Sequence, residues 1–217
     1  PRLAAAMCAG GRALEVLDLS GNRLGDGGAA ELGRALAGAP RVQQLALGNN
    51  AIGDAGLDAL LDALCAGGAP ALAVLDLRWN RLHAPAPLAR ALQHPALALQ
   101  HLDLSWNKLG APGALALAAS LRGSALRTLL LGHCDVPAEA ALPLARALQE
   151  AGCALEELVL SGNPLGQDGA RTLLGGVRAE SRLRRIELRG CGLHAAGDIP
   201  AAVVAPPAGG ALDGADN

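Results

Sequence analysis

The sequence predicts an α/β solenoid, a horseshoe in which a parallel sheet lines the concave side and α-helices cover the convex side. Two observations predict this fold. An eleven-residue phrase occurs seven times within 217 residues at nearly constant spacing, and stretches with helical periodicity lie between its copies. A phrase that recurs at a fixed period of this length is the sequence signature of a repeat architecture.

The phrase carries an aliphatic residue at its first, fourth, sixth and eleventh positions. Its first copy is LEVLDLSGNRL and its last is LRRIELRGCGL. Successive copies start 27 to 30 residues apart, at Leu14, Val42, Leu72, Leu99, Leu126, Leu155 and Leu183. We therefore expect seven strand-bearing repeats in residues 14–197, within one domain that spans residues 1–197.

Each phrase should contain a short strand, because apolar and other residues alternate around its fourth to sixth positions. Side chains of a strand point to opposite faces in turn, so the fourth and sixth residues form the core and the third and fifth face the hollow. Neighbouring strands lie about 4.8 Å apart and neighbouring helices about 10 Å apart, so stacked repeats must bend with the strands inside.

Helical periodicity follows several strands, at Gly25–Leu36, Gly53–Leu64, Gly110–Leu121 and Pro137–Leu148. Asp26, Asp54 and Asp168 stand where an N-cap is expected. Prolines fall in the equivalent turn at Pro85, Pro112 and Pro137. Each repeat should thus read strand, turn, helix.

The ninth position of the phrase should form an internal ladder. It holds Asn22, Asn50, Asn80, Asn107, Cys134, Asn163 and Cys191. The chain turns inward here, and an amide can pair the backbone groups that would otherwise be buried without partners. A cysteine can do so weakly while packing as a small apolar group.

The phrase and the stretch LGDGGAAELGRAL that follows its first copy resemble the ribonuclease-inhibitor-like subclass of leucine-rich repeats. The resemblance covers about residues 12–204. It implies units near 28 residues with a true helix on the convex side, and a protein that acts by holding another protein. The subclass includes ribonuclease inhibitors, nucleotide-binding immune sensors and the Ran GTPase-activating protein.

The two ends depart from this pattern. Residues 1–13 resemble the helix of a preceding repeat whose strand is absent, so we expect the chain to be a segment of a longer protein. Residues 198–217 are rich in proline, glycine and alanine, which predicts a weak last helix followed by a tail.

Composition makes several partners and compartments unfavourable. The net charge is −2, without the clustered cations that recruit nucleic acid or an acidic membrane. No apolar run is long enough to span a bilayer. Five scattered cysteines and no glycosylation sequon predict free thiols in an intracellular, reducing compartment, most simply the cytoplasm, with a cilium, organelle or nucleus left open.

No group of residues predicts catalysis, a cofactor or a metal. The glycines at Gly25–Gly28 recur at the strand-to-helix turn and lack the rest of a phosphate loop. His133, Cys134 and Cys153 lack the spacing of a zinc site. Acidic residues at the fifth position, Asp18, Asp76, Asp103 and Glu187, fit a solvated face that selects a basic partner better than an acid/base pair.

The strongest site signal is the placement of Trp79 and Trp106, the chain's only aromatic residues of the Phe, Trp and Tyr types. Both occupy the eighth position of adjacent repeats, where other repeats carry Gly, Asn or His. The scaffold therefore does not need a large group there, and tryptophan is enriched in interface hot spots. A purely structural cover for the sheet edge is the alternative. We expect their indoles to lie side by side at one rim of the hollow.

We expect a non-enzymatic protein-interaction scaffold that binds another protein with repeats three to five and that is a candidate subunit of a larger assembly. The candidate partner-binding residues are Trp79, Trp106, Arg78, Asp76, His101, Asp103, Ser105, His133, Arg185, Glu187 and Arg189. Arg182 and Arg184 extend a basic patch on the last repeat, which could dock an acidic segment or simply be solvated. A small-GTPase regulator resembling the Ran activator, or the sensing region of an immune receptor, remains an alternative.

Overall fold

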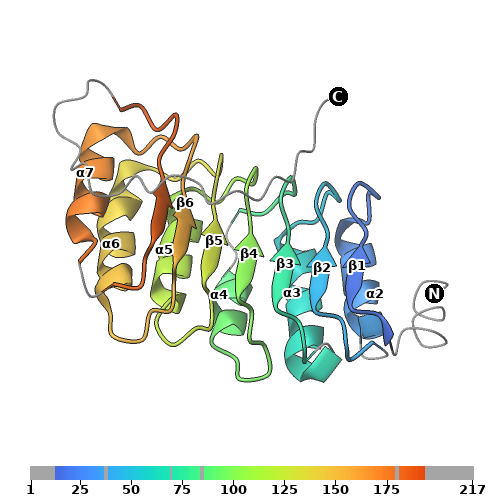
Figure 1. Ribbon diagram of the computed structural model, residues 1–217. Helices are drawn as coiled ribbons and strands as arrows, with labels where there is room; N and C mark the ends of the chain where they lie inside the picture. Colours follow the sequence, from blue (N-terminus) through green and yellow to red (C-terminus); the bar gives the residue numbers. More distant parts are fainter. Residues whose placement is uncertain (1–12, 37–38, 69, 84–85, 179–180, 194–217) are drawn as a thin grey trace.

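The computed structural model describes residues 13–36, 39–68, 70–83, 86–178 and 181–193. Its strands form one parallel sheet in chain order (Figure 1). They are β1 Val16–Asp18, β2 Gln44–Ala46, β3 Val74–Asp76, β4 His101–Asp103, β5 Thr128–Leu130, β6 Glu157–Val159 and β7 Arg185–Glu187. The seven strand-bearing repeats predicted from the phrase are confirmed.

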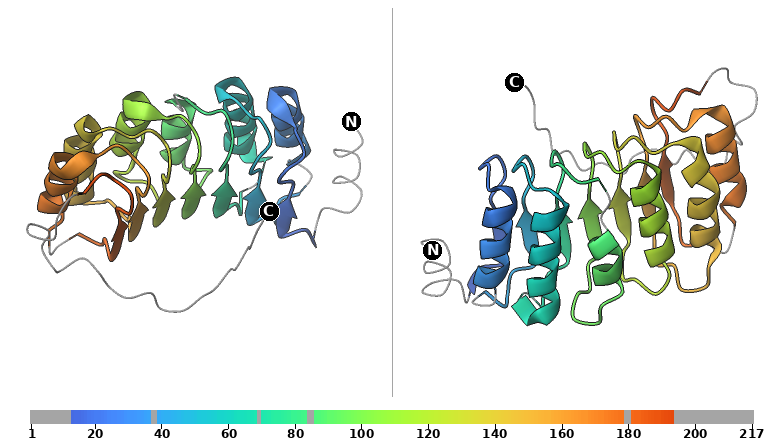
Figure 2. Two further views of the ribbon diagram at one scale, coloured as in Figure 1. Left: turned by 90° about the horizontal axis from the view of Figure 1, so that it is seen from above. Right: turned by 180° about the vertical axis from the view of Figure 1, so that it is seen from behind.

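Helical segments alternate with the strands and lie together on one side of the sheet (Figure 2). They are α2 Gly25–Leu36, α3 Asp54–Ala63 with a π-helical turn at Leu64–Gly68, α4 Ala86–Leu92, α5 Gly110–Ser120, the 3₁₀ turn Ala138–Ala140 leading into α6 Ala141–Gln149, and α7 Gly166–Gly176. The view from above shows the row bending toward the strands, so the array is an open arc with the sheet on its inner side.

The strands pair without any shift between repeats. The central leucines Leu17, Leu45 and Leu75 are direct partners, and the alignment continues through Leu102, Leu129 and Leu158 to Ile186. From β2 to β6 these residues are at most 1% exposed. The alternation in the phrase thus places its leucines between sheet and helices, as predicted, and leaves the third and fifth positions on the strand side.

The ninth-position ladder joins each repeat to the one before it. Asn80 donates from Nδ2 to the carbonyl oxygens of Leu77, in its own repeat, and Leu47, in the previous one. Its Oδ1 accepts from the backbone N–H of Asn50 and Ile52. One amide therefore satisfies four backbone groups in two repeats, which are costly to bury unpaired.

The two cysteines of the ladder keep part of this arrangement. The thiol of Cys134 lies 3.1 Å from the carbonyl oxygen of Leu104, and that of Cys191 lies 3.2 Å from the carbonyl oxygen of Leu160. Each carbonyl belongs to the preceding repeat, so each thiol donates where an amide would. A protonated thiol is required for this, and burial raises the pKa of the Cys134 thiol to about 12.

The expected N-caps are wrong. The N-cap residue of α3 is Gly53 and that of α7 is Leu165, and neither makes a side-chain cap hydrogen bond. Asp26 lies inside the first turn of α2, and its Oδ1 accepts a hydrogen bond of 2.7 Å from the backbone N–H of Gly53. Asp54 likewise accepts from the N–H of His83. Both carboxylates therefore lie inside their helices and link neighbouring repeats.

Three further sequence predictions lie outside the described residues. They are the helix of a preceding repeat at residues 1–12, the turn role of Pro85, and the weak last helix with its tail at residues 198–217. The other two prolines of that set are described: Pro112 lies in the first turn of α5, and Pro137 directly precedes the 3₁₀ turn.

Candidate functional site

The eighth position of the phrase adopts a left-handed backbone conformation in every repeat. Its φ values are 53–60° at Asn49, Trp79, Trp106 and His133, and 66–74° at Gly21, Gly162 and Gly190. Glycine and asparagine enter this region readily, whereas a bulky side chain costs about 1–2 kcal/mol there. Two tryptophans and a histidine therefore occupy positions that glycine would fill with less strain.

Backbone hydrogen bonds extend the sheet ladder through this turn. The N–H of Trp79 donates to the carbonyl oxygen of Ser105 at 2.9 Å, and the N–H of Trp106 donates to that of Gly132 at 2.8 Å. His133 donates in the same way to Ser161. The turns of adjacent repeats are thus held in strand-like alignment, which places equivalent side chains one above the next.

The result is a stack of three aromatic rings, which we call the aromatic row and define as Trp79, Trp106 and His133. The indole centroids lie 4.2 Å apart with ring planes inclined by 7°. The imidazole of His133 follows at 3.9 Å from Trp106 and 15°. Trp79 is still 52% exposed and Trp106 42% exposed, so the stack contacts solvent. The indoles lie side by side, in the arrangement that the sequence suggested.

Three of the four acidic residues at the fifth position each accept a hydrogen bond from the backbone two residues further along. One oxygen of Asp76 accepts from the N–H of Arg78, and one oxygen of Asp103 accepts from the N–H of Ser105. Asp18 does the same for Ser20. Part of each carboxylate therefore fixes the turn that leads to the eighth position.

Asp76 and Asp103 differ in their charge environment, although they are direct partners in β3 and β4. Asp76 forms an ion pair of 3.0 Å with the guanidinium of Arg78. Desolvation by burial, the largest influence, raises the pKa of Asp76, and the charges of Asp103 and Asp18 act in the same direction. Asp103 is only 8% exposed and forms no ion pair with a described residue.

The repeats themselves match a known protein family. The family model for the Leucine Rich repeat matches residues 12–33, 42–61, 98–118 and 153–174. The chain is a leucine-rich repeat protein. No curated protein sequence matches it. The ribonuclease-inhibitor-like subclass is not distinguished by these matches and stays a prediction.

Two solved structures have a similar fold. The tropomodulin C-terminal domain of Caenorhabditis elegans is 17% identical, with a TM-score of 0.53 over 68% of this chain and 90% of that one. The leucine-rich repeat-containing protein LegL7 of Legionella pneumophila is 19% identical, with a TM-score of 0.58 over 88% of this chain and 61% of that one. At such identities the likeness concerns the fold alone.

The candidate residues of the last repeat do not join the aromatic row. Arg185, Glu187 and Arg189 lie on or next to β7, three strands beyond β4 in the sheet. The guanidinium of Arg185 is engaged by Glu157 at 2.7 Å and by Glu187. The leucine-rich repeats therefore separate the predicted site into two groups, of which repeats three to five hold the larger.

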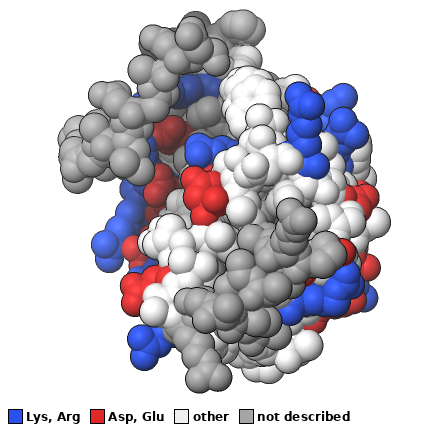
Figure 3. Space-filling view, turned by 90° about the vertical axis from the view of Figure 1, so that its right-hand side faces the viewer, with Lys and Arg blue, Asp and Glu red and all other residues white. Residues whose placement is uncertain are grey.

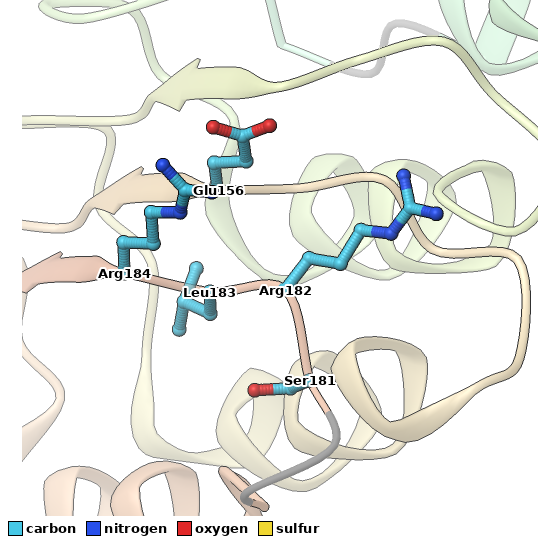
Figure 4. Close-up of a pocket in the computed structure, with 5 residues that line it drawn as sticks. All are labelled: Glu156, Ser181, Arg182, Leu183 and Arg184. Carbon is cyan, nitrogen blue, oxygen red and sulfur yellow. The ribbon is translucent and has the colours of Figure 1, made fainter.

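Two pockets were not anticipated from the sequence. A cavity of about 350 Å³ lies at the start of β7 and is lined by Glu156, Ser181, Arg182, Leu183 and Arg184 (Figure 4). The close-up shows the two arginines extending in different directions, with the Glu156 carboxylate on the Arg184 side. Glu156 itself pairs with Arg127 at 2.8 Å. The basic patch predicted on this repeat is thus divided between the cavity rim and the strand side.

The second pocket, of about 240 Å³, lies between α3 and α4 on the helix side. Its lining includes Asp62, Cys65, Arg90 and His94. The pocket lies beside α4, which is short and spans only Ala86–Leu92. Among the described residues, no three His, Cys, Asp or Glu side chains gather as metal ligands, and no described helix has the length and hydropathy to cross a membrane.

Proposed function

We propose that the chain is a non-enzymatic protein-interaction scaffold that binds a partner protein on its concave side, at repeats three to five. The repeat architecture favours this class of function, because a solenoid presents an extended, curved face built from side chains that the fold itself does not require. The extended face also supports a place within a larger assembly. The predicted free thiols support an intracellular location.

The aromatic row is the observation that carries the proposal. Trp79 and Trp106 keep about half of their surface in contact with solvent while their backbone occupies a strained region that glycine fills in repeats one, six and seven. Residues in this backbone region cluster at binding and active sites. Stacking holds the rings in place before binding, so less conformational freedom is lost when a partner covers them.

A quantitative pull-down tests the proposal. The affinity-tagged chain and its Trp79→Gly, Trp106→Gly double variant would be compared by mass spectrometry of bound proteins from a reducing cell extract. A specific partner should be enriched on the first chain and fall at least tenfold on the second, since truncating a hot spot costs about 2 kcal/mol or more. Glycine is chosen because it suits the backbone at both positions.

The matched control is the double variant Leu115→Ala, Leu142→Ala. These leucines are also exposed large apolar residues, but they lie in α5 and α6 on the helix side. They should leave partner recovery unchanged. Equal recovery with the tryptophan variant and the original chain, with circular dichroism showing both folded, would place the interface elsewhere.

A further inference from the structure

The strand side of the molecule is electrically asymmetric along its length. At the second, third, fifth and seventh positions of repeats one to four, the charged residues are four carboxylates and one guanidinium: Glu15, Asp18, Asp76, Asp103 and Arg78. The same positions in repeats five to seven hold three carboxylates and four guanidinium groups: Glu156, Glu157, Glu187, Arg127, Arg184, Arg185 and Arg189. Viewed from the N-terminal end, acidic and basic side chains both appear along the strand side, at left in Figure 3.

The two halves also differ in how these charges are neutralised. In repeats five to seven each of the three carboxylates pairs with an arginine, through the Arg127–Glu156 pair and the two contacts of Arg185. Among the described strand-side carboxylates of repeats one to four, Asp76 alone has such a partner, Arg78. Asp18 and Asp103 form no ion pair with a described residue, and the solenoid therefore leaves negative charge on this half of the hollow.

Asp103 is the least usual member of this set. It is more than nine-tenths buried, its side chain lies beside the Asp76 strand, and one of its oxygens is committed to the N–H of Ser105. A buried carboxylate is costly unless a cation compensates it. His101 lies two residues earlier on the same face of β4, and Arg78, which follows the neighbouring strand β3, is engaged by Asp76.

We propose that the concave side of repeats one to four receives an arginine-bearing segment of the partner protein, with a guanidinium group at Asp103 next to the aromatic row. This inference rests on the proposed function and names the chemistry of the partner. Arginine fits better than lysine because its planar guanidinium pairs with a carboxylate through two donors and also packs against indole rings. Charge complementarity, set against the fully paired carboxylates of repeats five to seven, selects this end of the hollow.

Basic residues of the scaffold mark the outer limit of the surface. The tenth position of the phrase, directly after the ladder asparagine, holds an exposed basic residue in three repeats: Arg23, Arg81 and Lys108. An arginine-bearing segment should therefore lie within the hollow rather than across its rim, since like charges meet it there. An acidic segment should instead lie across the basic rim. A test should therefore compare an acidic peptide with a basic one.

The test uses the whole chain and two fluorescent peptides, one of six arginines alternating with glycine and one with glutamate in place of arginine. Anisotropy measures affinity at low salt. The intrinsic emission of Trp79 and Trp106, the chain's only tryptophans, reports whether the peptide reaches the aromatic row. The arginine peptide should bind and change this emission. Asp103→Asn keeps an acceptor for Ser105 and should weaken binding at least fivefold.

Asp62→Asn is the control, because it removes the same charge from an exposed position in α3 on the helix side. It should alter affinity less than twofold. The inference is overturned if the arginine peptide does not bind, if the two variants bind equally, or if the glutamate peptide gives the same emission change. A natural partner lost in the tryptophan variant but retained by Asp103→Asn would leave the proposed function standing and remove the arginine contact.

Discussion

The imidazole of His133 fills the space that a side chain at Gly162 would need. A β-carbon added to Gly162 would lie 2.3 Å from Cε1 of His133, far inside van der Waals contact. Gly162 occupies the eighth position of repeat six and has no side chain. The ring of His133, the last of the aromatic row, can therefore lie over the backbone of Gly162.

Gly162→Ala should therefore destabilise the protein more than Gly21→Ala. Both glycines have nearly the same backbone conformation, with φ of 74° and 73°, and each alanine pays about 1–2 kcal/mol for it. Only at Gly162 must a ring also move, because nothing lies within 4 Å of a β-carbon at Gly21. Urea unfolding measures the difference. Equal losses, with unchanged tryptophan emission, would contradict the ring position.

Alkaline pH should weaken the fold through Cys134. Burial raises its pKa from 9.0 to about 12. The folded state holds this proton more tightly than the unfolded state, so the stabilisation is complete below pH 9 and falls as pH rises toward 12. A single such group contributes a loss of about 2 kcal/mol between pH 9 and 10.5. The chain has no tyrosine and only one lysine to titrate alongside it.

Denaturant unfolding at several pH values checks this prediction, with Cys134→Ser as the comparison. Serine retains a hydroxyl that can donate to the Leu104 carbonyl, but it does not ionise in this range. The serine variant should start less stable and lose less with rising pH. Burial also raises the pKa values of the Cys65, Cys153 and Cys191 thiols, and these groups contribute to the slope that remains.

Sequence periodicity predicted the parts of this fold that repeat. The leucines of the strands and the asparagine ladder recur at one spacing, so each copy supports the interpretation of the others. The N-caps were wrong because Asp26 meets Gly53, a partner 27 residues away in the next repeat, whereas capping is inferred from adjacent residues. A hydrogen bond between residues one repeat apart leaves no pattern among adjacent residues from which it could be predicted.

The sequence positions of the candidate residues could be predicted, but the contacts of their side chains could not. Glycine and asparagine at four of the seven eighth positions could have indicated the left-handed turn. The participation of His133 in the stack depends on ring orientation, which the phrase does not encode. The engagement of Arg185 by Glu157 on the adjacent strand and by Glu187 on its own strand likewise depends on side-chain orientation.

The ladder amide gives a direct stability prediction. Asn80→Ala removes bonds to the carbonyls of Leu47 and Leu77 and to the N–H groups of Asn50 and Ile52, and it should cost about 1–3 kcal/mol. Arg23→Ala, at an exposed residue of the first turn, should change the melting temperature little. Similar shifts for the two variants, measured by calorimetry, would argue against the inward orientation of the amide.

All five cysteines should carry free thiols. The four that lie in described residues, Cys65, Cys134, Cys153 and Cys191, are free in the structure, and Cys8 lies outside the described residues. Intact mass after alkylation without reduction should show five additions. An internal disulfide between ladder cysteines would require repeats five and seven to approach each other more closely than two strand spacings of about 4.8 Å.

The strain in the aromatic row predicts an inverted order of glycine and alanine at Trp79. Either substitution removes stacking with Trp106, worth about 0.5–1.5 kcal/mol. Glycine also relieves the left-handed backbone, whereas alanine keeps most of its cost of about 1 kcal/mol. Trp79→Gly should thus be close to the original chain in stability, and Trp79→Ala about 1 kcal/mol below it.

Leu115 provides the comparison, since it is an exposed apolar residue inside α5. In a helix interior glycine is about 1 kcal/mol less favourable than alanine, so Leu115→Gly should be the less stable of its pair. Urea unfolding of the four variants then separates backbone strain from loss of the side chain. If glycine proves worse than alanine at Trp79 as well, the left-handed turn is not strained, and the retention of tryptophan there no longer argues for a binding role.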